Sequence, residues 1–343
     1  MKKTMAWLLT ALMALSLLGC GGGSGTAGAT ESAGMTTGSP STPGTEDAAA
    51  STVTPETAPP PAPPAAEKEP DTIVLPPEAP PPVETVGTET VRYTVSRDAV
   101  EETLRATDGT RIAEVRYTLP LLQAVVEVDE EDVILTEENS DTDLRENALA
   151  VTAAFNAGFD EWRKDNETLK MYAEGDFAQQ PDMFREMGMY YADALEFTSW
   201  QTDGLVSIRG SGYSYYGGAH PNTMLPAWNF DLNRGEFITP LAIAADETEF
   251  RSVVAEELKV LADERAKGLE TEPTVLYWED YAAILQNWSE TSVSFDTAGM
   301  TVSYSPYELG CYASGSHEFT ISYAFLEPYL SEYGRELLGL TGS

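Results

Sequence analysis

Residues 205 to 222 read LVSIRGSGYSYYGGAHPN and contain the clearest strand-and-turn pattern of the chain. The first twelve residues are rich in β-branched and aromatic side chains, which favour a strand. Gly217 and Gly218 follow, and glycine readily adopts the positive φ angles of a tight turn. Pro221 favours an extended conformation for the preceding His220. The pattern predicts a strand that ends in a shaped loop.

Strand-like and helical segments surround this strand without regular alternation. Other β-rich runs occur at residues 90–96, 111–119, 123–128, 190–200, 224–232, 292–296, 300–303 and 318–323. Apolar residues recur every three or four positions at 143–172 and 247–267, with Thr248 placed to begin the second helix. Shorter helices are expected at 278–286 and 324–333. This order predicts an α+β fold with antiparallel sheets and a few packed helices, as one compact unit or two lobes.

The N-terminal segment has the features of a bacterial lipoprotein signal. Lys2 and Lys3 precede an almost unbroken apolar run, which is short for a bilayer span and ends in Leu17-Leu18-Gly19-Cys20. We expect residues 1–19 to be removed and the Cys20 thiol to be acylated, which would anchor the chain in the lipid bilayer at the extracytoplasmic face of the cell membrane. The alternative is an ordinary secretory signal that happens to contain a cysteine.

Residues 20–88 are predicted to form a disordered linker. They are dominated by Gly, Ala, Ser, Thr and Pro and contain no aromatic residue, so they cannot bury enough apolar surface to offset chain entropy. The Pro-rich half favours extended polyproline conformations, which would hold the folded region away from the membrane. The alternative is that the proline runs are ligands for a recognition domain.

The charge of the chain narrows the choice of partners. The sequence holds 20 basic and 56 acidic residues, and its formal net charge is −36. Residues 91–343 alone carry 17 basic and 46 acidic side chains. Such a surface repels a phosphate backbone, because nucleic-acid binding depends on Lys and Arg releasing counterions. We therefore expect no nucleic-acid partner.

The inventory of reactive side chains is small. Cys311 is the single cysteine of the predicted folded region, so no disulfide is expected there. His317 lies six residues later, so one interpretation is a Cys311 nucleophile with His317 as its base. The favoured interpretation is a structural cysteine beside a histidine in a turn. No spacing suits a zinc site, and no phosphate-binding Gly loop is present. The acidic stretch 129–141 could collect calcium weakly, but a solvated loop is favoured. We expect no metal, no cofactor and no enzymatic activity.

Several motifs resemble those of a known family. They are Tyr216-Gly217-Gly218-Ala219-His220-Pro221, Trp228-Asn229-Phe230-Asp231, the segment 300–310 and the closing strand 319–323. Together they resemble the extracytoplasmic domain of RsiV-type anti-sigma factors, which pairs two domains of unknown function. Residues 112–120 and 147–162 resemble its first strands and long helix. The resemblance predicts an N-terminal strand-helix module at 89–188 and a C-terminal module at 189–343.

The resemblance implies a binding or sensing module of the cell envelope. The best understood member of that family binds lysozyme outside the cell, and related modules occur beside peptidoglycan-modifying enzymes. The negative charge of this chain suits a cationic partner independently of the resemblance, because opposite fields raise association rates. The sequence shows neither a sigma-binding segment nor a second apolar stretch of bilayer length, so signalling by the cleavage route of that family is not expected.

The sequence thus predicts a lipid-anchored, non-enzymatic binding module whose ligand is a lysozyme-like protein or a cell-wall component such as peptidoglycan. The candidate ligand-binding residues are Tyr213, Tyr215, Tyr216, Gly217, Gly218, His220, Tyr304, Tyr307 and Tyr312. The same residues could instead pack as a hairpin. Two other functions stay open at this point, a cell-wall hydrolase that uses His220 with a carboxylate such as Asp231, and a structural envelope lipoprotein.

Overall fold

The computed structural model describes residues 84–86, 89–128, 131–164 and 166–340. The predicted signal peptide, the lipidation site Cys20 and most of the predicted linker lie outside the described residues. The described residues belong to one compact unit. No helix among them is both long enough and apolar enough to span a membrane.

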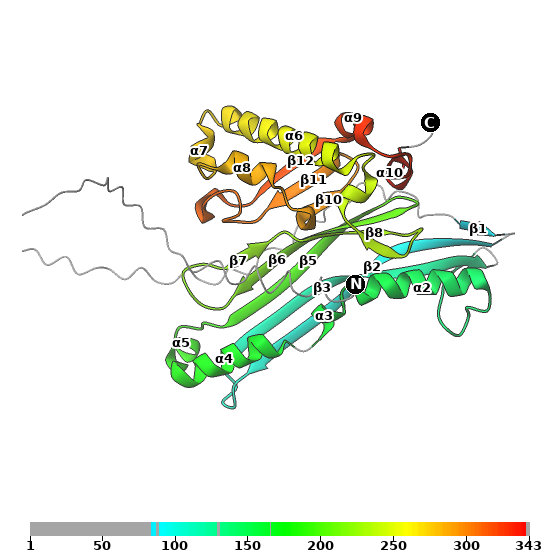
Figure 1. The fold of residues 1–343 in the computed structure, drawn as a ribbon. Coiled ribbons are helices and arrows are strands. Elements are labelled where there is room, and N and C mark those ends of the chain that lie inside the picture. Colours follow the sequence, from blue (N-terminus) through cyan, green and yellow to red (C-terminus); the bar gives the residue numbers. More distant parts are fainter. Residues whose placement is uncertain (1–83, 87–88, 129–130, 165, 341–343) are drawn as a thin grey trace, which may run out of the picture. The chain divides into compact units, whose positions relative to one another are not determined.

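The large sheet has nine strands (Figure 1). They are β1 (Glu84–Val86), β2 (Glu89–Arg105), β3 (Arg111–Val128), β4 (Glu131–Ile134), β5 (Tyr191–Gln201), β6 (Leu205–Tyr215), β7 (Asn222–Met224), β8 (Ala227–Asp231) and β9 (Glu236–Ile238). The order is β1-β2-β3-β5-β6-β8-β9, with β4 on β3 and β7 on β6. Each pairing is antiparallel except that of β3 with β5, which is parallel.

A set of helices makes the parallel pairing of β3 and β5 possible. Parallel neighbours need a long crossover connection, which α2 (Asp143–Ala157), α3 (Asp160–Arg163), α4 (Glu167–Gln179) and α5 (Pro181–Arg185) supply.

The prediction of a single helix at 143–172 is wrong, because the chain leaves the helix at Gly158. A side chain there would collide with the Phe237 ring. The predicted module boundary at 188/189 falls in this connection and stays a prediction, although β3 and β5 pair across it.

The C-terminal part adds a three-stranded antiparallel sheet of β10 (Val293–Phe295), β11 (Gly299–Tyr304) and β12 (His317–Ser322). Its α-helices are α6 (Glu247–Gly268), α7 (Pro273–Leu276), α8 (Tyr281–Gln286), α9 (Tyr323–Leu326) and α10 (Glu332–Leu337). Short 3₁₀ helices are η1 (Pro240–Ile243), η2 (Glu290–Ser292), η3 (Tyr312–Ser314) and η4 (Glu327–Tyr329). The α+β prediction is confirmed, whereas the helix expected at 324–333 is broken into α9, η4 and the start of α10.

Helix α6 forms for the reasons that its sequence indicates. Its apolar positions recur on one face, where Phe250, Val254 and Leu258 are fully buried. The cap differs from the expected Thr248, because the Asp246 carboxylate accepts the backbone N–H of Glu249 at 2.8 Å. An N-terminal carboxylate also suits the helix dipole.

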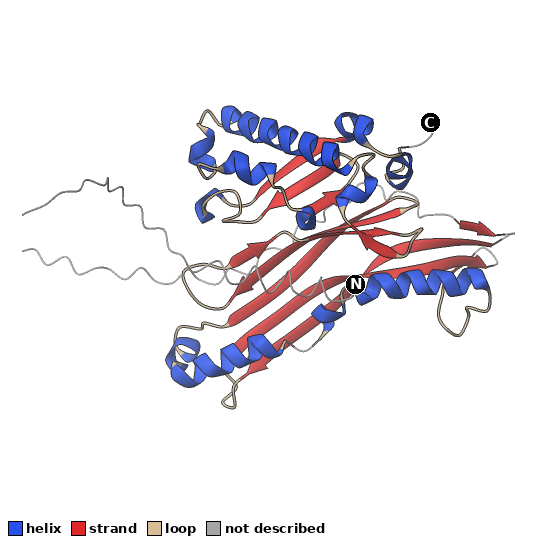
Figure 2. Cartoon of the chain, viewed as in Figure 1, coloured by secondary structure: helices blue, strands red, loops and turns tan. Residues whose placement is uncertain are grey.

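Strand β6 lies between two cores. Val206 and Ile208 pack in the cluster that contains Phe155 of α2, whereas Leu205 packs in the cluster that contains Phe250 of α6. Successive side chains of a strand point to opposite faces, so this alternation places the two cores on opposite sides of β6. Figure 2 shows α2 and α4 along one side of the large sheet and the small sheet with α6 along the other.

Buried polar groups fix the small sheet on β6. The Ser207 hydroxyl donates to Asn229 Oδ1 and accepts the backbone N–H of Phe295, both at 2.8 Å. The Asn229 amide donates to the Val293 carbonyl at 2.8 Å. Each polar atom of this bridge therefore has a partner, as buried polar groups require.

Candidate functional site: a half-exposed aromatic belt

Three aromatic side chains from two distant segments meet beside the end of β6. The His220 ring stacks on Tyr312 with the centroids 3.8 Å apart and the planes 15° apart. His220 Nε2 lies 2.8 Å from the Tyr307 hydroxyl, and the rings of Tyr307 and Tyr312 are 5.8 Å apart. Tyr307 is 42% exposed and the other two rings are half-buried. The predicted loop residues are thus brought together at the surface.

Tyr307 reaches His220 from an unusual backbone conformation. Its φ is 74°, in a region that bulky residues rarely occupy and that costs about 1 to 2 kcal/mol. The surrounding contacts hold it there. The Trp278 indole donates to the Tyr307 carbonyl at 3.2 Å, and the Glu308 carboxylate accepts the backbone N–H of Ser305 at 2.5 Å. Burial raises the pKa of Glu308 above its ordinary value.

Strand β6 adds two tyrosines to the same surface. Tyr213 and Tyr215 are two positions apart and therefore lie on one face of the strand, both half-buried. The Tyr215 hydroxyl donates to the Gly218 carbonyl at 3.1 Å. Gly217 and Gly218 have φ angles of 85° and 99°, as the predicted turn requires. Burial raises the pKa of Tyr213, with further contributions from the nearby tyrosines Tyr190, Tyr215 and Tyr312.

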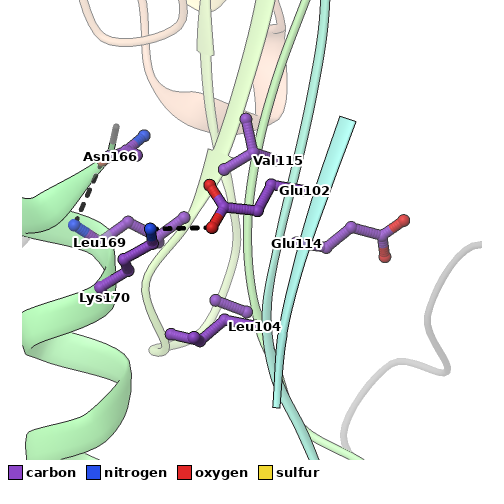
Figure 3. Close-up of a pocket in the computed structure, with 8 residues that line it drawn as sticks. Glu102, Leu104, Glu114, Val115, Asn166, Leu169 and Lys170 are labelled. Atoms are coloured by element: carbon purple, nitrogen blue, oxygen red, sulfur yellow. Dashed lines mark hydrogen bonds and ion pairs between the residues drawn. The ribbon is translucent and has the colours of Figure 1, made fainter. Parts of the chain in front are cut away.

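Small residues of β5 lie beside the tyrosines on this face of the sheet. Ala192 pairs with Tyr215 and Ala194 with Tyr213, so the two alanines lie on the same face as the rings. On β3, Glu114 pairs with Ala192. Figure 3 shows Glu114 pointing away from Leu169 and Lys170 of α4, on the opposite side of the strand. The tyrosine face is therefore the one that α4 does not cover.

One further aromatic residue completes the surface. The Arg111 guanidinium lies 3.6 Å from the centroid of the Tyr190 ring and forms an ion pair with Glu114. We call the six half-exposed rings the aromatic belt: Tyr190, Tyr213, Tyr215, His220, Tyr307 and Tyr312. Tyr190 was not among the site residues predicted from the sequence. It directly precedes β5 and lies close enough to Tyr213 to contribute to the raised pKa of that tyrosine.

Two predicted site residues lie outside the belt. Tyr216 points to the opposite face of the sheet, where its hydroxyl donates to Asp193 at 3.0 Å and its ring packs on Tyr191. Tyr304 on β11 is only 5% exposed, and its hydroxyl is buried without a hydrogen-bond partner. The structure places these two residues in packing positions.

Asp193 is the centre of a buried polar cluster that was not predicted from the sequence. Its Oδ2 accepts the hydroxyls of Tyr117 and Tyr216, both at 3.0 Å, and the Asn166 amide at 3.5 Å. Its Oδ1 is buried without a partner. Burial raises the pKa of Asp193 and, together with the Asp193 charge, the pKa of both tyrosines. The signal was an acid inside an alternating strand, at a position where apolar residues are expected.

Two hollows lie beside this cluster on the α4 side. The first, shown in Figure 3, has a volume of about 10 Å³ and lies beside the Lys170–Glu102 ion pair. It has room for about one water molecule. The second is about 610 Å³ and is lined by Tyr117, Glu161, Trp162, Lys164, Asn166, Glu167 and Thr168. Neither involves a residue of the belt.

The residues considered for catalysis do not come together. Asp231 is fully buried and accepts the Tyr333 hydroxyl at 2.6 Å and the backbone N–H groups of Asn233 and Arg234. His220 contacts tyrosines instead. His317 is buried and lies 3.3 Å from the Ser314 hydroxyl, and burial lowers its pKa. Within the described residues, no group of three His, Cys, Asp or Glu side chains could hold a metal ion.

No family model matches the chain, and no curated protein matches it. Two solved structures align with it. One is a member of the DUF3298 family from Bacteroides fragilis, with 17% identity, coverage of 73% of this chain and 98% of that one, and a TM-score of 0.48. The other is a DUF3298 family protein from Pseudomonas aeruginosa, with 15% identity, coverage of 70% and 95%, and a TM-score of 0.37. These neighbours are named after a domain of unknown function, and the RsiV-type assignment stays a prediction.

Proposed function

We propose that this protein is a lipid-anchored, RsiV-like binding or sensing module on the extracytoplasmic face of the cell membrane, and that the aromatic belt is its contact surface. The observation that carries the proposal is the conformation of Tyr307. Backbone strain of this kind persists where surrounding contacts over-determine it, and such sites are enriched in ligand clamps. Here the strained residue is exposed and holds its ring against His220 and Tyr312.

The chemistry of the belt suits recognition. Tyrosine supplies a large amphipathic surface with few rotatable bonds, so little conformational entropy is lost when a ligand orders it. The rings of His220 and Tyr312 already stack on each other, which lowers that cost further. The belt therefore offers a preorganised surface to a ligand.

The first ligand to test is a cationic protein such as lysozyme, because the chain carries a net charge of −36. The full chain in detergent micelles is titrated with lysozyme in a calorimeter at low and high salt. We expect binding that weakens steeply as salt rises, since the attraction between the net charges is screened. If no heat of binding appears at low salt, lysozyme is not the ligand.

The second ligand is insoluble peptidoglycan, tested by cosedimentation with the full chain. The belt variants Tyr307→Ala and Tyr312→Ala are compared with Tyr172→Ala, which alters a tyrosine of α4 that is 55% exposed and lies outside the belt. We expect the belt variants to lose capture and the control to keep it. Equal loss in all three would show that the belt is not the contact surface.

The membrane anchor has its own test. Cys20→Ser removes the thiol that would be acylated, so we expect the variant to appear in the soluble fraction of cells while the parent chain stays with the membrane. Equal membrane association of both proteins would contradict lipidation at Cys20.

A further inference from the structure

Hydrogen-bond partners distinguish the belt tyrosines from five other tyrosines of the described residues. Those five hydroxyls donate to carboxylates: Tyr117 and Tyr216 to Asp193, Tyr191 to Asp176, Tyr281 to Asp263 and Tyr333 to Asp231. No tyrosine hydroxyl of the belt is bonded to a carboxylate of the described residues.

Several belt hydroxyls are available to form hydrogen bonds with a ligand. Those of Tyr190, Tyr213 and Tyr312 make no hydrogen bond to the described residues, although all three side chains are half-buried. A phenolic hydroxyl both donates and accepts, so each can bond a neutral hydroxyl or amide group. The Tyr307 ring is 42% exposed, and the face of an aromatic ring carries the negative side of its quadrupole, which attracts C–H groups.

Several charged side chains near the belt form ion pairs with one another. Glu114 forms ion pairs with both Arg111 and Arg116, and the Arg111 guanidinium also lies over the Tyr190 ring. On the other side, Arg209 pairs with Glu318 at 3.3 Å. A charged ligand group would have to compete with these pairs, whereas a neutral polar ligand would not.

We propose that the aromatic belt binds a neutral oligosaccharide. A pyranose ring has an apolar C–H face and a rim of hydroxyl groups, which suits a surface that combines the exposed Tyr307 ring with unbonded phenolic hydroxyls. Sugar rings would stack on Tyr307 and Tyr312, and their hydroxyl or acetamide groups would bond Tyr190 and Tyr213. The inference rests on the proposed function and deepens it by naming the ligand class of the same surface.

The test is calorimetry of the full chain in micelles with the β-1,4-linked tetramer of N-acetylglucosamine, a neutral probe. We expect binding whose Kd changes less than about twofold between low and high salt, because no net charge is paired. Tyr307→Ala and Tyr312→Ala should each raise the Kd about tenfold or more. Tyr213→Phe, which removes only a hydroxyl, should raise it several-fold, and Tyr172→Ala should leave it unchanged.

Two results would overturn the inference. If the tetramer gives no binding while lysozyme or peptidoglycan is still captured through Tyr307 and Tyr312, the belt binds a protein or a charged wall group, and the proposed function stands without the glycan. If the tetramer binds equally well to Tyr312→Ala, the glycan site lies elsewhere. Unfolding midpoints of all variants, measured in urea, separate lost binding from lost folding.

Discussion

Tyrosines at the end of β6 have different roles on the two faces of the sheet. Tyr216, which directly follows β6, donates to Asp193, as Tyr117 does, within a packed cluster. On the other face Tyr213 and Tyr215 belong to the belt, where no hydroxyl is bonded to a carboxylate. The comparison teaches that burial and a hydrogen-bond partner, not residue type, separate tyrosines that stabilise the fold from tyrosines that are available to a ligand.

The largest expected effect comes from truncating a tyrosine of the Asp193 cluster. Tyr117→Ala removes a ring that is 4% exposed and packs edge-on against Trp162, so we expect the free energy of unfolding to fall by about 3 kcal/mol or more. Tyr307→Ala should lower it by less than about 1 kcal/mol, because that ring is exposed. Urea titrations measure both. Similar losses of stability in the two variants would contradict the distinction between tyrosines of the Asp193 cluster and tyrosines of the belt.

Removing a single hydroxyl sharpens the same contrast. Tyr216→Phe leaves the Asp193 carboxylate with one hydrogen bond fewer, which should cost about 1 to 2 kcal/mol, since bonds to charged groups are the stronger ones. Tyr215→Phe loses only a bond to the Gly218 carbonyl at the surface and should cost less than about 0.5 kcal/mol. A larger cost for Tyr215→Phe than for Tyr216→Phe would contradict the assignment.

The Asp193 cluster should also make stability depend on pH. Burial raises the pKa of Asp193, so the folded state binds this proton more tightly than the unfolded state. The contribution is complete below the ordinary pKa of 3.8 and is lost as the pH rises through the folded-state pKa. We expect the parent protein to lose stability relative to Asp193→Asn as the pH rises above 3.8. Parallel pH profiles of the two proteins, measured by urea unfolding, would show that the carboxyl is not perturbed.

A small effect on stability is also expected at Tyr307. Glycine accepts a φ of 74° without strain, so Tyr307→Gly should change the free energy of unfolding by no more than about 1 kcal/mol, with a gain favoured. Tyr307→Phe retains the strain and the ring and serves as the control. A loss of several kcal/mol in Tyr307→Gly would mean that the ring stabilises the fold and that its strain has no role in binding.

Much of the secondary structure could be predicted from local pattern. The β-branched and aromatic run before Gly217 gave β6, and the apolar period of 247–267 gave α6. The long β3 was predicted as two strands, 111–119 and 123–128, because its alternation changes phase. Buried positions are odd-numbered at Tyr117 and Leu119 and even-numbered at Leu122 and Ala124. When the apolar alternation shifts by one residue within a strand, the sequence pattern indicates two strands instead of one.

The loop of the candidate site could be predicted from the sequence, but the set of tyrosines that share its surface could not. The loop glycines and proline placed His220, but which tyrosines share its surface depends on strand register and on contacts between residues about 90 positions apart. Tyr216 points to the opposite face from Tyr215, and Tyr304 lies in β11 whereas Tyr307 lies in the turn that follows it. The Asp193 cluster was missed because tertiary partners, absent from local sequence, make a buried acid tolerable.

The double variant Tyr307→Ala/Tyr312→Ala tests the central claim most directly. Its capture by insoluble peptidoglycan and its urea midpoint are measured beside those of the parent chain and of Tyr172→Ala. If the belt is the contact surface of an envelope-binding module, the double variant loses capture while its midpoint stays close to that of the parent. Capture that persists at the parent level in a folded double variant would contradict the account.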